Sequence, residues 1–121
     1  ADGVGLGHHF LKHLERTRLL LHVVDIAPMN DTVNPVQEAK ALVEELRKYN
    51  EALYHKPRWI VFNKIDLLPA SEQDAACQQF IRDFKWKDKW FTVSALTGEG
   101  CKSLTYAVMD YLEQTFSAAQ H

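Results

Sequence analysis

The chain has 121 residues, 46% of them apolar, with 14 basic and 16 acidic side chains and a formal net charge of −2. This length fits one domain or part of one, and the charge balance argues against a strongly electropositive nucleic-acid surface. No apolar run approaches the roughly 20 residues of a membrane span, no signal peptide is visible, and the two cysteines match no zinc spacing, so we expect a cytoplasmic chain with reduced thiols.

The N-terminal segment is rich in glycine, with three of the five glycines among the first seven residues. Because the chain begins at Ala1 rather than at a methionine, we interpret it as a fragment that starts within a loop. Residues 3–7 are expected to form a flexible lead-in. The spacing of the apolar side chains that follow predicts a short helix from about Leu6 to Arg16.

A strand and a long helix are predicted next. The apolar run from Leu19 to Val24, which ends at Asp25, is typical of a strand buried on both faces. After a loop, Asn34 is a favourable N-cap and Pro35 suits the first position of a helix. Apolar side chains at helical spacing then predict its buried stripe: Val36, Ala39, Val43, Leu46 and Tyr49.

Two further strands and two further helices complete the pattern. Apolar runs at 59–62 and 90–93 predict strands, and Ser71 is a candidate N-cap for the helix between them. Gly98 and Gly100 predict a tight connection into the last helix. This alternation predicts an α/β fold in which three parallel strands carry helices on both faces.

A polar motif follows the second predicted strand, at the edge of a parallel sheet where ligands bind. Asp66 can accept both the N1–H and the 2-amino group of guanine, whereas adenine presents an acceptor at N1. Asn63 can bond the base edge or tie neighbouring loops together, and the Lys64 stem can lie over the base plane. Ile65 is expected to space these groups and to pack inward. The motif predicts one half of a guanine pocket.

The run 94–96, after the third predicted strand, predicts the second half. The backbone N–H of Ala95 can donate to guanine O6, which adenine replaces with an amine. Ser94 is expected to hold the Asp66 loop in place, and Leu96 to shield one edge of the base. Such short motifs also occur by chance and often form only a strand-to-helix turn. Their position at successive strand ends favours the guanine pocket.

With these motifs, the chain resembles the guanine-nucleotide domain of the Obg-type GTPases, within the translation-factor-related P-loop GTPases. The resemblance covers nearly the whole chain, and its first stretch separates Obg proteins from other GTPases; it is carried by residues 5–17, 21–25, 56–69 and 93–100. It implies a three-layer Ras-like fold. Residues 1–121 would form its C-terminal half, from the second switch through the two guanine-specificity loops.

The same resemblance implies the function of the parent protein. It implies binding of GTP and GDP through Asn63, Lys64, Asp66 and the loop 94–96, and slow hydrolysis of GTP to GDP and phosphate with Mg²⁺. It also implies association with the large ribosomal subunit and its assembly. The phosphate loop, the Mg²⁺ ligands and the glycine-rich N-terminal domain of the family are expected outside this chain.

Several other motifs are interpreted as decoys. Residues 98–103 end in Lys-Ser but have the wrong glycine spacing for a phosphate loop, and Asp2 belongs to a D-x-x-G that no strand precedes. His9 and His13 stand one helical turn apart without the glutamate of a zinc protease, so we assign no metal site. His22 is expected to be buried and hydrogen-bonded. No catalytic residue is assigned, and the fragment alone is expected to have no GTPase activity.

Two alternatives stay open. A non-catalytic binding module could use the pocket or a helix face to dock on a ribosome or another protein, whereas a dinucleotide-binding half-domain lacks its G-x-G-x-x-G. By the family resemblance, the strand from Leu19 to Val24 pairs with a strand that this chain does not contain. It would then expose an apolar edge through which the fragment self-associates.

Overall fold

The computed structural model describes residues 7–27 and 32–119. Its elements, in chain order, are α1 (His8–Leu14), β1 (Leu20–Asp25), α2 (Pro35–Tyr49), α3 (Glu51–Tyr54), β2 (Arg58–Asn63), the 3₁₀ turn η1 (Ile65–Leu67), α4 (Ala70–Phe84), β3 (Trp90–Thr92) and α5 (Cys101–Ala119). The predicted α/β fold with three parallel strands and flanking helices is confirmed. No helix in the described ranges combines the length and apolarity that crossing a membrane requires.

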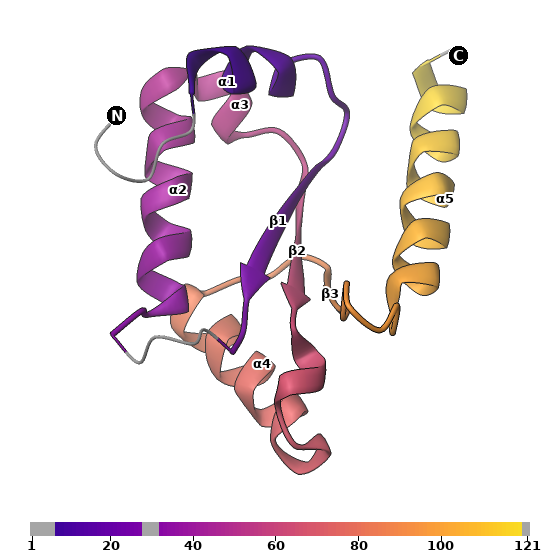
Figure 1. The fold of residues 1–121 in the computed structure, drawn as a ribbon. Helices are drawn as coiled ribbons and strands as arrows, with labels where there is room; N and C mark the ends of the chain where they lie inside the picture. Colours follow the sequence, from indigo (N-terminus) through magenta and orange to yellow (C-terminus); the bar gives the residue numbers. More distant parts are fainter. Residues whose placement is uncertain (1–6, 28–31, 120–121) are drawn as a thin grey trace.

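The three strands form one parallel sheet in the order β1-β2-β3. Figure 1 shows that β1 and β2 run in the same direction, and the register places Asp25 of β1 beside Asn63 of β2. β2 is the central strand, and its residues 59–62 are all buried. The loops that follow the strands therefore meet at one edge of the sheet.

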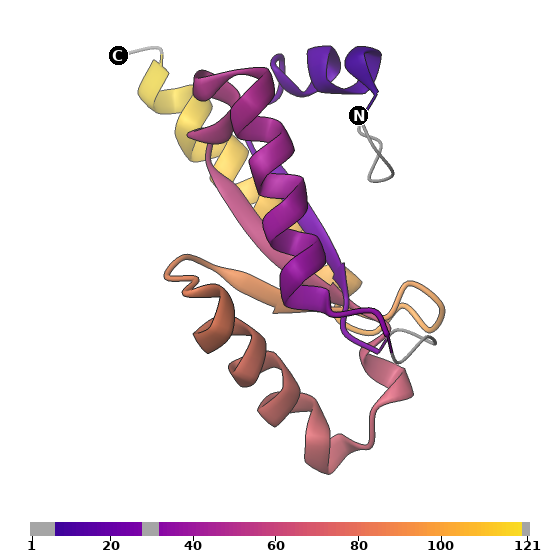
Figure 2. The same ribbon diagram turned by 90° about the vertical axis from the view of Figure 1, so that its left-hand side faces the viewer.

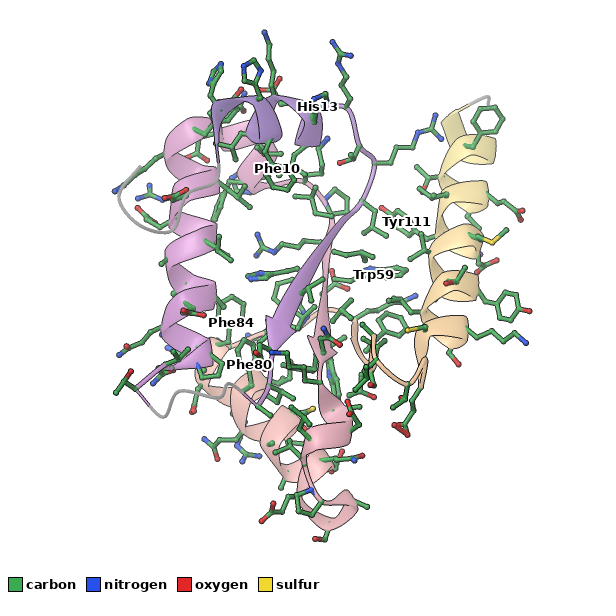
Figure 3. The ribbon with its side chains drawn as sticks, viewed as in Figure 1. Phe10, His13, Trp59, Phe80, Phe84 and Tyr111 are labelled. Carbon is green, nitrogen blue, oxygen red and sulfur yellow. The ribbon has the colours of Figure 1, made fainter. Side chains whose placement is uncertain are left out.

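Helices cover both faces of this sheet. Figure 2 shows α2 in front of the strands, α5 behind them and α4 below, and the same buried cluster joins α2 and α4 to one face of the sheet. On the α2 and α4 side, Phe62 packs edge-on against Phe80, with ring centroids 5.0 Å apart. On the other side, Trp59 lies 5.4 Å from the ring of Tyr111 on α5 (Figure 3). Alternate residues of β2 thus serve the two layers, as a strand with a period of two requires.

A second buried cluster joins α1 and α3 to the amino end of the sheet; it consists of Leu11, Leu20, Leu46 and Leu53. The short helix α3 was not predicted. Its signal is Asn50, whose Oδ1 accepts from the N–H groups of Ala52 and Leu53 at 2.7 and 3.3 Å. The Lys56 ammonium donates to the carbonyls of Leu14 and Glu15 at 3.0 and 2.8 Å, which ties the end of α1 to this cluster.

Of the two N-caps predicted from the sequence, one is confirmed and one is wrong. Asn34 caps α2 as predicted, because its Oδ1 accepts from the N–H groups of Val36 and Gln37 at 3.0 and 3.2 Å. The prediction for Ser71 is wrong: α4 begins at Ala70, after Pro69, and no side chain caps it. Pro69 is extended and immediately precedes the helix, so the first helical turn already begins at Ala70, one residue before Ser71.

β1 differs from its prediction because only one of its faces is buried. Leu20 and Val24 are buried, whereas Leu21 and Val23 on the opposite face are 41% and 57% exposed. Within the described ranges β1 pairs with β2 alone, which leaves its other edge without a strand partner. An apolar run makes a strand suitable for burial on both faces, but each face is buried only where another element covers it.

His22, also in β1, packs edge-on against Phe84 at 6.4 Å between centroids. His22 is only partly buried, and its ring makes no hydrogen bond to a described residue, so the predicted buried and hydrogen-bonded histidine is not found. Burial, and then the positive charge of Arg58, lower the pKa of His22 from 6.5 to about 4. The folded chain therefore favours neutral His22 more strongly than the unfolded chain does.

Acidification should destabilise the fold through His22. The contribution of neutral His22 to the free energy of unfolding is fully present above pH 6.5. It is lost as pH falls from 6.5 towards 4, where the total loss is at most about 3 kcal/mol. Thermal melts between pH 7.5 and 4.5 check this. The variant His22→Leu should show a flatter dependence of melting temperature on pH, and an unchanged slope would contradict the assignment.

Candidate functional site

The loop that follows β2 carries the first predicted motif. Lys64 adopts a left-handed conformation, with φ 65° and ψ 29°, so the chain turns sharply out of β2 into η1. Ile65 is buried, as expected, and its N–H donates to the carbonyl of Val93 at 3.3 Å. This bond joins the loop after β2 to the loop after β3.

Asn63 makes a second connection between the same two loops. Its Oδ1 accepts from the backbone N–H of Ala95 at 3.0 Å. The residues predicted to contact guanine from two separate strands therefore touch each other. Of the two uses expected for Asn63, the structure shows the tie between loops.

The loop after β3 is closed by its own hydrogen bonds. The Ser94 N–H donates to the carbonyl of Glu99 at 2.9 Å, and the Gly98 N–H donates to the carbonyl of Ser94 at 2.7 Å. The fully buried Ser94 Oγ accepts from the N–H of Thr97 at 3.1 Å. The expected bond from Ser94 to the Asp66 loop is not found among the described contacts, because Ser94 braces its own loop instead. Leu96 is 87% exposed at the tip.

Gly100 ends this loop against the sheet. It has φ +79°, and a Cβ built on it would lie 2.1 Å from the carbonyl oxygen of Thr92 in β3. Only glycine allows both the positive φ and this approach. Gly100, one of the glycines of the run rejected as a phosphate loop, thus has a structural role, since it lets the start of α5 pack onto the end of β3.

The structure adds Asp25 to the residues identified from the sequence. Its Oδ2 accepts from the Lys64 ammonium at 2.8 Å, with both side chains partly exposed. Its Oδ1 accepts from the N–H of Ala27 at 3.0 Å. Sequence reasoning placed Asp25 only at a strand end. Asp25 joins the site because the register of β1 on β2 sets it beside Asn63. That register is a property of the assembled sheet, so it could not be read from residues 20–25 alone.

Asp66 stands apart from these contacts. It lies in η1, is half-buried, and its carboxylate has no hydrogen bond to a described residue. A carboxylate with both oxygens available can accept two adjacent donors. Asn63, three residues before Asp66, and the Ala95 backbone N–H are bonded to each other at the same edge of the sheet. Together these groups can read the hydrogen-bonding edge of a planar base.

The described part of the chain offers no group of three His, Cys, Asp or Glu side chains placed to hold a metal ion. Asp2, from the D-x-x-G decoy, lies outside the described residues. His9 and His13 belong to α1, where the ring of His9 packs edge-on against that of His8 with centroids 6.3 Å apart. The described site has the groups to bind a base.

No family model matches the chain. A solved structure described as a nucleolar GTP-binding protein 1 from Plasmodium falciparum matches 84% of this chain and 50% of its own length, with 20% sequence identity and a TM-score of 0.43. The chain therefore spans half the length of that protein.

Proposed function

We propose that this chain binds guanine nucleotides and is the base-recognition part of an Obg-type GTPase domain with a Ras-like fold. The observation that carries the proposal is the bond between Asn63 and Ala95, together with an Asp66 carboxylate that no described residue occupies by a hydrogen bond. This bond brings together residues that are 32 positions apart and that the sequence assigns to one pocket.

Each group has a role in this proposal. Asp66 accepts from N1–H and the 2-amino group of guanine, while the Ala95 N–H, now bonded to Asn63, is shared with or transferred to guanine O6. The Lys64 stem lies against the base, and Leu96, exposed without a ligand, closes over its edge. Ile65 and Ser94 hold the two loops from below.

The wider role is proposed for the parent protein in the cytoplasm. Residues 1–121 extend from the second switch through both guanine-specificity loops, and the phosphate loop lies in the rest of the parent. There the parent hydrolyses GTP to GDP and phosphate, with Mg²⁺ supplying charge neutralisation on the phosphates. Its site of action is the large ribosomal subunit during assembly. The chain alone binds without turnover.

Titration with a fluorescent GDP analogue tests the proposal directly. We expect saturable binding that unlabelled GDP displaces and ADP does not, because ADP presents the wrong donors and acceptors to Asp66 and Ala95. Displacement by GDP and ADP alike would refute recognition of the base. Absence of binding to a chain shown to be folded would refute a pocket that works without the phosphate contacts.

The exposed edge of β1 predicts self-association of the chain. Leu21 and Val23 are exposed beside an edge that pairs with no described strand, and such edges template further strand pairing. Sedimentation equilibrium should show dimers that weaken when Val23→Lys places a charge there. The control Leu67→Lys changes a similarly exposed residue, 56% accessible, away from β1. A monomer at high concentration would contradict the prediction.

The rival function, a binding module without catalysis, has exposed apolar side chains in its favour. Tyr106 and Met109 of α5 are 63% and 53% exposed, and Leu21 and Val23 of β1 are also exposed. A protein partner that covers either pair would use apolar contacts rather than the guanine pocket. Binding of such a partner that is indifferent to GDP and to substitution of Asp66 would favour this rival.

A further inference from the structure

We propose that Asp25 is a positioning residue for guanine recognition: it holds the Lys64 ammonium away from Asp66 and thereby keeps the Asp66 carboxylate available to the base. The inference rests on the function proposed above and adds a residue from a third strand to the same pocket. It follows from how the three charged groups are arranged at the carboxyl ends of β1 and β2.

Asp25 is held as a fixed acceptor. Its Oδ1 is bonded to the N–H of Ala27 at 3.0 Å, so its Oδ2 is oriented towards Lys64, 2.8 Å from the ammonium. The backbone supports this arrangement, because Asp25 is in register with Asn63 and the N–H of Ile26 donates to the Asn63 carbonyl at 3.3 Å. The acceptor for Lys64 therefore belongs to the neighbouring strand and not to the loop that contains Lys64.

Two consecutive residues at the end of β2 consequently reach in opposite directions across the sheet. Asn63 contacts Ala95 beyond β3, and Lys64 contacts Asp25 in β1. The left-handed conformation of Lys64, with φ 65°, accompanies this divergence. Asp66 follows in η1 and is bonded to neither neighbour.

Lys64 would otherwise compete for Asp66. The two residues are only two positions apart, and a flexible four-carbon stem lets the ammonium reach a carboxylate on the same turn. An ammonium on Asp66 would occupy the oxygens that guanine needs and would neutralise the charge that strengthens both bonds. The pair with Asp25 prevents this, and it leaves the apolar stem of Lys64 in place to cover the base.

The first test needs no nucleotide. The ¹³C signal of the Asp66 carboxyl group is recorded by NMR in the unmodified chain, in Asp25→Asn, and in Asp25→Asn combined with Lys64→Met. Asparagine keeps an acceptor for the Ala27 N–H and removes the ion pair, and methionine keeps an apolar stem without the charge. The Asp66 signal should shift in Asp25→Asn and return in the double variant. An unshifted signal in Asp25→Asn would overturn the inference.

The second test measures recognition in the same variants, with GDP and with IDP, whose hypoxanthine lacks the 2-amino group. Asp25→Asn should lose about tenfold in GDP affinity and most of its preference for GDP over IDP. The double variant should regain that preference. A loss that Lys64→Met does not rescue would mean that Asp25 acts only through folding, and the inference would fall.

The two tests separate this inference from the proposed function. If the unmodified chain shows no preference for GDP over ADP, the proposed function fails, while the Asp66 signal still decides whether Asp25 shields that carboxylate from Lys64. The matched control is Glu44→Gln, which removes the exposed ion pair between Glu44 and Arg47 on α2. It should alter neither the Asp66 signal nor nucleotide preference.

Discussion

The variant Asp66→Asn should exchange the preference of the pocket from guanine to xanthine nucleotides. An asparagine amide places an N–H₂ donor opposite the 2-amino donor of guanine, so one bond is lost and a repulsion is created. Xanthine carries an oxygen at that position, which accepts from the amide. Because each charge-assisted bond contributes roughly 1.5–3 kcal/mol, GDP affinity should fall roughly 10- to 100-fold while XDP affinity rises.

Competition of GDP and XDP against a fluorescent GDP analogue, and against its xanthine counterpart, measures this exchange. The control is Asp83→Asn, which changes an exposed aspartate of α4 that accepts from Gln79 and lies outside the predicted site. Asp83→Asn should leave both affinities unchanged. An Asp66→Asn chain that still prefers GDP would refute the role given to Asp66.

The variant Gly100→Ala should cause a large loss of stability. The new Cβ would lie 2.1 Å from the Thr92 carbonyl oxygen, which is backbone and cannot rotate away, and 3.3 Å from the Cα of Val93. The positive φ adds its own strain. We expect a loss of roughly 2–4 kcal/mol in the free energy of unfolding, and a fall of roughly 10 °C in melting temperature.

Gly98→Ala is the matched control for this prediction. Gly98 has a similar φ of +84°, but a Cβ there meets no atom within 4 Å. Its cost should be only the backbone strain, about 1 kcal/mol. Urea denaturation of the two variants therefore separates close packing from strain. Equal losses in the two would show that contact with β3 is not what requires Gly100.

The same comparison connects stability to the site. Gly100 packs against Thr92, two residues before Ser94, whose N–H, carbonyl and hydroxyl together close the loop that carries Ala95. Displacing the start of α5 would therefore shift the Ala95 N–H that Asn63 now accepts. Gly100→Ala should weaken guanine binding more than Gly98→Ala does, in proportion to its effect on folding.

Much of this chain could be predicted because the deciding interactions are local. The apolar run at 59–62 predicted the strand β2, and an Asn followed by Pro predicted the start of α2, since a cap depends on N–H groups within three residues. Local signals were also overlooked: Asn50 caps α3 in the same way. Where Pro69 sets the entry to α4, the nearby Ser71 gave the wrong start.

The order of residue types indicates which chemistry gathers at the carboxyl edge of the sheet, because residues 63–66 and 94–96 each follow an apolar run and parallel strands end together. How these residues are used depends on contacts between distant parts of the chain. The register of β1 on β2 places Asp25 within hydrogen-bond distance of Lys64. The fold of the loop after β3 places the Thr97 N–H within hydrogen-bond distance of the Ser94 hydroxyl. The lack of cover on one face left Leu21 and Val23 exposed. Residue type sets what a side chain can bind, whereas pairing register and packing set which partner lies within reach.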